Sequence, residues 1–171
     1  MTGRQVAVTL ALVVAAVILQ TTMFGEGRIQ PFGAAPNIVT LVVISTVRYL
    51  DPEPGILIGF TAGLLLDLLG GSPLGLWAMS MTVVAFVTLR VRRRADEGWL
   101  IVAIGVFGLT LLGQVLFAVG GTLFGQRTLN NPSVVQTMIL PSLYNMLLAV
   151  LVLPGVTKLM GVGPVVRSWA K

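Results

Sequence analysis

The sequence contains no cysteine and no histidine, and both absences limit what the protein can do. Without cysteine the chain has no disulfide, no thiolate metal ligand and no thiol to carry a lipid. Without histidine it lacks the usual general base and the commonest metal ligand. No phosphate-binding loop, nucleophile elbow or carboxylate pair on one helix face occurs either. We therefore predict a protein that is not an enzyme and that uses no metal and no cofactor.

Charge is also scarce. Charged residues make up 10% of the 171 residues and hydrophobic residues 56%, whereas about a quarter of a typical soluble domain is charged. The charges are segregated, which leaves long uncharged runs and indicates an integral membrane protein of one domain. The net charge of +5 would suggest nucleic acid in a soluble chain. Neither a basic stripe nor interleaved aromatic residues occur, so we predict no nucleic-acid partner.

Six apolar runs predict an all-α membrane domain over residues 1–171, with six transmembrane helices. The predicted spans are residues 6–24, 36–50, 55–70, 74–89, 98–121 and 133–153. The second run is short and reaches membrane length only if residues 33–36 enter the interface. Asn37 is expected to cap the start of that helix. Pro154 is expected to end the last one.

Basic residues indicate the orientation of these spans. With six spans both termini lie on one side, together with nine basic residues: Arg4, Arg48, Arg90, Arg92, Arg93, Arg94, Lys158, Arg167 and Lys171. The other side carries only Arg28 and Arg127. The positive-inside rule then predicts cytoplasmic termini. The cluster of Arg90, Arg92, Arg93 and Arg94 is interpreted as a topology signal, and contact with anionic lipid stays open as a second role.

Residues 55–76 are the stretch around which the other runs are arranged. Gly55, Gly59 and Gly63 recur every four residues, so they lie on one side of a helix, and Asp67 continues the series. Small residues at this spacing let two helices approach closely. The favoured interpretation is packing against a helix of the same chain. The alternative is a groove for another protein's helix.

Asp67 is the only acidic residue inside an apolar run, and an ionisable group there is a candidate functional site. A turn built from Gly70, Gly71, Ser72 and Pro73 follows it, and Gly75 comes two residues later. In a structural interpretation, the carboxylate accepts hydrogen bonds from N–H groups of this turn or of the next helix start. In a functional interpretation, it contacts a docking partner or a ligand. A proton relay is not favoured, because no second carboxylate lies within the runs to pass a proton on.

Several amides lie in or beside the apolar runs, and three of them are candidates for contacts between helices: Asn37, Gln114 and Asn145. We interpret them as interhelical hydrogen-bonding groups, each worth about 1 kcal/mol or less. Pro141 lies within the last predicted helix and is expected to kink it. Asn145, one turn later, is expected to cover part of the carbonyl that this proline frees.

Two segments carry a resemblance to a known family. PNIVTLVVI, a Pro-Gly turn and GFTAGLLLDLLGGSPLGLWA together resemble the rod shape-determining MreD family, most closely over residues 59–78. The family motif corresponds here to Pro36, Asn37, Gly59, Gly63, Asp67, Gly71, Ser72, Pro73, Leu74 and Gly75. Trp77 departs from the pattern, because a smaller or more polar residue, often His, is expected after Gly-Leu.

The resemblance implies a role in the cell-elongation machinery of the bacterial cytoplasmic membrane. Members are understood to bind MreC, a bitopic membrane protein, and to act near MreB, the glycan polymerase RodA and a class B penicillin-binding protein in peptidoglycan synthesis. Their six-helix fold is similar to the substrate-binding subunits of energy-coupling-factor transporters. We hypothesise that residues 55–70 and the Asp67 turn hold a partner's transmembrane helix. The alternative is a subunit of a vitamin transporter, with Asp67 near an outward-facing pocket.

Overall fold

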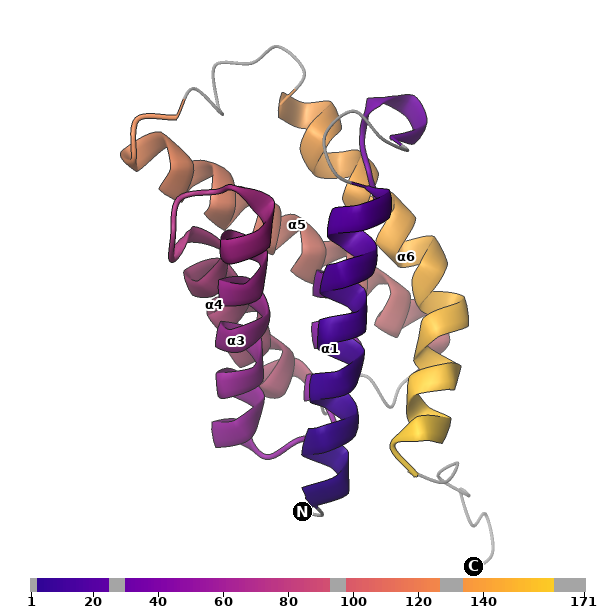
Figure 1. The fold of residues 1–171 in the computed structure, drawn as a ribbon. Coiled ribbons are helices and arrows are strands. Elements are labelled where there is room, and N and C mark those ends of the chain that lie inside the picture. The colour runs from indigo at the N-terminus through magenta and orange to yellow at the C-terminus, as the bar shows by residue number, and fades with distance from the viewer. Residues whose placement is uncertain (1–2, 25–29, 93–97, 127–133, 162–171) are drawn as a thin grey trace, which may run out of the picture.

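The computed structural model describes residues 3–24, 30–92, 98–126 and 134–161, and in these ranges the fold is all-α. The α-helices are α1 (Gly3–Met23), α2 (Ile38–Val47), α3 (Pro52–Gly70), α4 (Leu76–Val91), α5 (Trp99–Leu123) and α6 (Val134–Leu159). A short 3-10 turn, η1 (Pro31–Gly33), precedes α2. Figure 1 shows α3 and α4 side by side, with α1 and α6 as two further long columns and α5 crossing obliquely behind.

Four helices are long and apolar enough to cross a membrane: α1, α3, α5 and α6. The other two are shorter. α2 has 10 residues, which corresponds to about 15 Å against a hydrocarbon core of about 30 Å. The prediction of a helix over 36–50 is therefore too long at both ends, and α2 does not reach across a bilayer by itself.

α2 instead forms the centre of the bundle. Nine of its ten residues are buried, which places this helix, apolar on all sides, in the core of the protein. On one side, Val39 and Val43 join an apolar cluster with α1, α3 and α4. On the other, Leu41 and Ile44 join a second cluster with α4, α5 and α6. α2 thus contacts each of the other five α-helices.

The start of α2 is fixed by two polar side chains. Asn37 caps it as predicted, since its side-chain oxygen accepts a hydrogen bond from the Thr40 backbone N–H at 3.1 Å. Gln20 of α1 donates to the Pro36 carbonyl at 3.1 Å and accepts from the Ile38 N–H at 2.8 Å. These contacts satisfy backbone groups that would otherwise lack hydrogen-bond partners at the start of the helix.

Elsewhere the helix ends lie within three residues of the predicted runs, except at the end of α6. The prediction that Pro154 ends this helix is wrong, because α6 continues to Leu159 with Pro141 and Pro154 inside it. A proline removes only one backbone donor. The last turn is stabilised by burial of Val156 and Met160.

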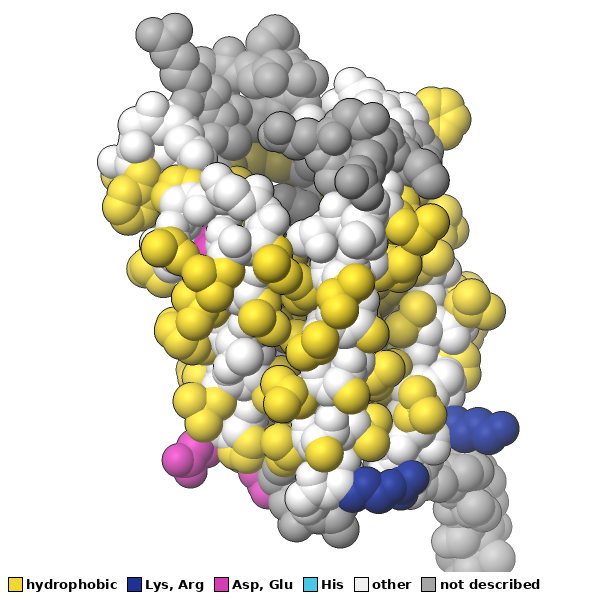
Figure 2. Space-filling model, in the orientation of Figure 1, with side chains coloured by type: hydrophobic (Ala, Val, Ile, Leu, Met, Phe, Trp, Pro, Cys, Tyr) yellow, Lys and Arg dark blue, Asp and Glu magenta, His cyan; other side chains and the backbone are white. Residues whose placement is uncertain are grey.

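The described chain begins and ends at the same end of the bundle (Figure 1). The Gln5 amide of α1 donates to the Met160 carbonyl, just beyond α6, at 3.5 Å. Figure 2 shows Lys and Arg side chains at this end and apolar side chains over the face between the two ends.

Candidate functional site in the hairpin of α3 and α4

The glycines of α3 lie directly against the backbone of α4. A Cβ atom built on Gly59 would lie 2.5 Å from the Ala85 Cβ and 2.8 Å from the Met81 carbonyl oxygen. One built on Gly63 would lie 2.5 Å from the Ala78 Cα. Real Cβ atoms do not come this close to other atoms, so only glycine lets the two helices meet at this distance.

Gly55, the first of the series, is less tightly enclosed. A Cβ there would lie 3.1 Å from the tips of two side chains, Leu89 of α4 and Val47 of α2. Side-chain tips can move, whereas the backbone of α4 cannot. The close contact is therefore concentrated at Gly59 and Gly63.

This geometry bears on the two interpretations of the glycine series. A helix of the same chain fills the face that carries Gly59 and Gly63, so this face is not an open groove. The hypothesis that residues 55–70 and the Asp67 turn hold a partner's helix would have to use another side of α3, and it stays a prediction. Packing within the chain, the favoured interpretation, is what the contacts support.

Asp67 is 3% exposed and accepts four hydrogen bonds. Its Oδ1 accepts from the Ser72 hydroxyl at 2.7 Å and from the Trp77 N–H at 3.0 Å. Its Oδ2 accepts from the N–H groups of Gly75 at 3.0 Å and Ala78 at 3.1 Å. Three of the four donors are thus backbone groups at the start of α4.

The carboxylate does for α4 what an N-cap side chain does for other helices. The residue at the cap position is Gly75, with φ 94°, and it has no side chain to accept a hydrogen bond. Asp67, eight residues earlier, occupies that place and adds a negative charge at the positive end of the helix dipole. Gly71, with φ 71°, ends α3 in the left-handed conformation and lets the chain turn back.

Each carboxylate oxygen of Asp67 therefore already has two donors from the protein. The contacts at the helix start are those of the structural interpretation, while the turn contributes the Ser72 hydroxyl rather than an N–H group. Pro73 accepts from the Leu76 N–H through its carbonyl at 3.2 Å, which closes the turn. These hydrogen bonds join the end of α3 to the start of α4. We call Asp67 and its four donors, on Ser72, Gly75, Trp77 and Ala78, the Asp67 lock.

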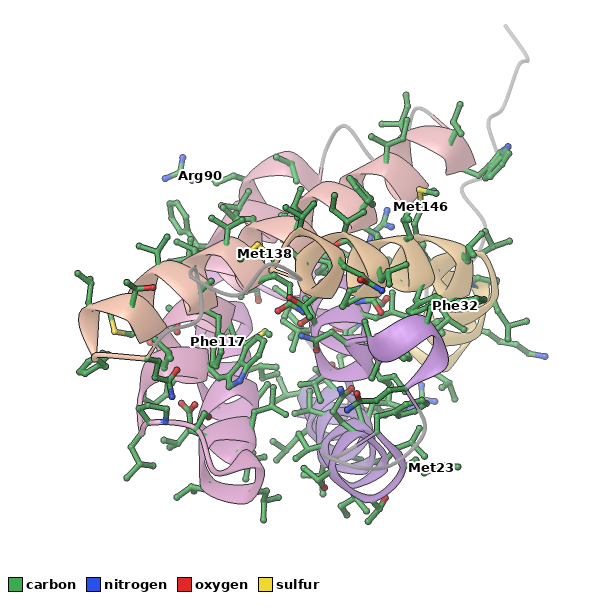
Figure 3. The ribbon with its side chains drawn as sticks, turned by 90° about the horizontal axis from the view of Figure 1, so that it is seen from above. Met23, Phe32, Arg90, Phe117, Met138 and Met146 are labelled. Atoms are coloured by element: carbon green, nitrogen blue, oxygen red, sulfur yellow. The ribbon has the colours of Figure 1, made fainter. Side chains whose placement is uncertain are left out.

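Trp77, the departure from the family pattern, connects this hairpin to α5. Its ring stacks on Phe117 with 4.2 Å between ring centroids and 26° between planes, and Figure 3 shows Phe117 pointing from α5 toward α4. The neighbouring Leu76 packs its side-chain tip against Gly120 of α5, close to where a Cβ would lie, so a larger residue at 120 would require Leu76 to move. A large aromatic ring here has a packing role that the sequence pattern did not indicate.

A second polar cluster lies in the core, where α2, α5 and α6 meet. The amide nitrogen of Asn145 donates to the Asn37 carbonyl at 2.8 Å and to the Thr110 hydroxyl at 3.2 Å. Asn145 is fully buried, and its Oδ1 has no hydrogen-bond partner within the described ranges. The expectation that it covers the carbonyl freed by Pro141 is wrong, because both amide hydrogens point elsewhere.

Thr110 was not among the predicted residues, and a lone hydroxyl in an apolar run was the only signal for it. Gln114, one turn further along α5, is partly buried. The hydrogen bonds of the described residues give its side chain no interhelical partner, so its role stays a prediction.

The arginines of the basic cluster have different surroundings in the structure. Arg92 donates to the Leu50 carbonyl at 2.6 Å, which ties the end of α4 to the end of α2. The Arg90 guanidinium lies 5.0 Å from the ring centre of Phe86. Arg93 and Arg94 lie outside the described residues.

A family model described as rod shape-determining protein MreD matches residues 2–162, which include the whole hairpin and both polar clusters. No curated protein and no solved structure matches the chain. The predicted likeness to transporter subunits therefore stays a prediction.

Proposed function

Because the chain belongs to the MreD family, we propose that it is a non-catalytic membrane subunit of the bacterial cell-elongation machinery. Membership of this family implies a role in rod shape determination. In the proposal the chain binds an MreC-like bitopic protein and helps to organise peptidoglycan synthesis near a RodA-type polymerase, a class B penicillin-binding protein and MreB. The observation that carries the proposal is the family match over nearly the whole chain.

We propose that all six α-helices cross the bacterial cytoplasmic membrane, with both termini in the cytoplasm. Four helices have the necessary length, and α2 lies inside the bundle, where a short helix and irregular backbone are tolerated. Basic residues support the orientation, because Arg4 and Lys158 belong to the two helix ends that meet at one end of the bundle.

In this proposal, the contacts between α3 and α4 support partner binding indirectly. Gly59, Gly63 and the Asp67 lock hold α3 and α4 in one arrangement, and the partner's helix binds a surface that this arrangement shapes. The occupied carboxylate oxygens support this role over direct contact with a partner. They also weigh against a vitamin-transporter subunit in which Asp67 binds substrate.

The experiment that tests the function is affinity purification of the tagged protein from gently solubilised membranes, followed by mass spectrometry. Recovery of a bitopic coiled-coil protein and wall-synthesis enzymes is the expected result. Recovery of ATPase subunits with a coupling membrane protein would instead identify a transporter. An unrelated membrane protein with the same tag, purified in parallel, controls for nonspecific recovery.

Variants then separate the indirect role from direct contact. Asp67→Ala and Gly63→Leu should reduce recovery of the partner only in proportion to the loss of folded protein, measured by size-exclusion chromatography. Loss of the partner from a fully folded variant would show that the motif contacts the partner itself.

A further inference from the structure

A cleft of about 540 Å³ lies between α4 and α5, close to the end of α2. Its walls are apolar and include Ile44 of α2, Val87 and Val91 of α4, and Val102, Leu109 and Leu112 of α5. Its volume is within the range of about 300–1,000 Å³ of small-molecule sites. Neither the family match nor the hairpin motif accounts for it.

Among the residues that the structure describes, two arginines are the only charged ones that line this cleft. Arg48 directly follows α2 and Arg92 directly follows α4, and both are partly buried. Arg92 uses one donor on the Leu50 carbonyl, and the Arg48 guanidinium lies 5.3 Å from the Tyr49 ring centre. Because a guanidinium has five N–H donors in a planar fork, both groups keep donors that suit a phosphate.

The α5 side of the cleft is left open by glycine. Gly105 and Gly108 both line it, and a Cβ on either would meet no atom within 4 Å. Ile101 and Ile104, also in the lining, are 42% and 58% exposed, so the apolar wall continues onto the outer surface of α5. An extended hydrocarbon chain could enter from the membrane along this wall.

We propose that this cleft binds an anionic phospholipid, with its phosphate between Arg48 and Arg92 and an acyl chain along Gly105 and Gly108. The cations lie at helix ends, where headgroups lie in a bilayer, while the apolar wall extends along α5 toward the hydrocarbon. A free phosphate would leave the apolar cleft unused, and a partner's apolar helix would leave two partly buried cations uncompensated. In the orientation proposed above, the lipid belongs to the cytoplasmic leaflet.

The test is native mass spectrometry of the full-length protein in detergent, titrated with phosphatidylglycerol or with phosphatidylcholine of the same acyl chains. We expect phosphatidylglycerol to bind roughly tenfold more tightly, since two cations contact its net negative headgroup. Arg48→Gln and the double variant with Arg92→Gln should lose most of this preference. If Arg92→Gln disturbs folding by losing the Leu50 contact, Arg48→Gln alone still decides the result.

Arg90→Gln is the matched control, because it removes the same charge from a side chain that points away from the bundle (Figure 3) and does not line the cleft. It should keep the preference. Equal binding of the two lipids by the unaltered protein would overturn the proposal. So would equal losses in Arg90→Gln and Arg48→Gln, which would indicate only a general surface charge.

The apolar part of the site is tested by Gly108→Leu, which fills the cleft. It should reduce binding of both lipids several-fold without lowering the unfolding temperature. Gly155→Leu is its control, since Gly155 also has no atom within 4 Å of a Cβ but lies on α6 outside the cleft. Unchanged binding in Gly108→Leu would overturn the proposal. So would a cross-link from Gly108→Cys to the transmembrane helix of a copurified protein.

Discussion

Asp67 shows how a single buried carboxylate can be stable in an apolar helix. Burying a charge without partners is costly, in a membrane as in a protein core. Here one hydroxyl and three backbone N–H groups of the next helix start surround it. The residue therefore couples the end of α3 to the beginning of α4. Replacing its carboxylate should lower the free energy of unfolding.

Asp67→Asn replaces one acceptor oxygen by an NH₂ group that faces backbone donors. We expect the free energy of unfolding to fall by about 2–3 kcal/mol, because buried N–H groups lose their charged acceptor. Thermal unfolding in detergent, followed by fluorescence-detected chromatography, measures the change. Glu53→Gln removes the same charge from an exposed position in the first turn of α3, and its effect should be about 1 kcal/mol or less. Equal losses of stability in the two variants would contradict the stabilising role of the Asp67 hydrogen bonds.

Asn145 has a comparable role in the core, on a smaller energy scale. Asn145→Ala removes two hydrogen bonds, to the Asn37 carbonyl and to Thr110, and should lower stability by about 1–2 kcal/mol. The same unfolding measurement applies. Gln114→Ala is the matched control and should have a smaller effect. A larger effect of Gln114→Ala would mean that its predicted interhelical bond exists.

At the scale of helices, α3 and α4 behave as one unit. Their glycine contact brings the two backbones together, the left-handed Gly71 reverses the chain, and Asp67 fixes the start of α4. The stacked rings of Trp77 and Phe117 then join this unit to α5.

Alanine in place of glycine distinguishes the packed face of α3 from the open face of α5. Gly63→Ala should destabilise the protein by about 1–3 kcal/mol, because its Cβ would overlap the α4 backbone. Gly108→Ala has space for its Cβ and should be neutral, or stabilising by up to about 1 kcal/mol through helix propensity. Unfolding midpoints of the two variants provide the comparison. Equal midpoints would contradict the tight packing.

At the scale of the whole molecule, the bundle is built around its shortest helix. α2 is buried on nearly all sides, and both apolar clusters include its residues. A short helix can have this position because Asn37 and Gln20 satisfy backbone N–H groups at its start, and Arg92 donates to the Leu50 carbonyl just beyond its end. The long helices around it present apolar side chains outward, as Figure 2 shows.

The proposed orientation can be measured because the chain has no native cysteine. Leu74→Cys and Glu53→Cys introduce single thiols at exposed positions at opposite ends of the α3–α4 hairpin. In intact cells a membrane-impermeant maleimide should label the thiol at 74 and not that at 53. Permeabilised cells should label both. The reverse pattern would contradict the cytoplasmic termini.

Much of the fold could be predicted from composition and local chemistry. Six helices follow from six apolar runs, and the Asn37 cap follows from a polar residue directly before one of them. The end of α6 could not be predicted, because Pro154 is a local stop signal that buried contacts of Val156 and Met160 outweigh. The length of α2 was overestimated for a related reason, since apolarity does not distinguish a membrane span from a core helix.

The sequence by itself determined that the protein is helical and apolar, that its family is that of MreD, and that Asp67 is its unusual carboxylate. These are properties of composition and of short segments. Only the tertiary structure decided which neighbour covers the glycine face, which donors surround Asp67, and that Arg48 and Arg92 share one cleft. The reason is physical: such contacts depend on how helices far apart in the chain approach each other, and spacing within one helix does not specify its neighbour.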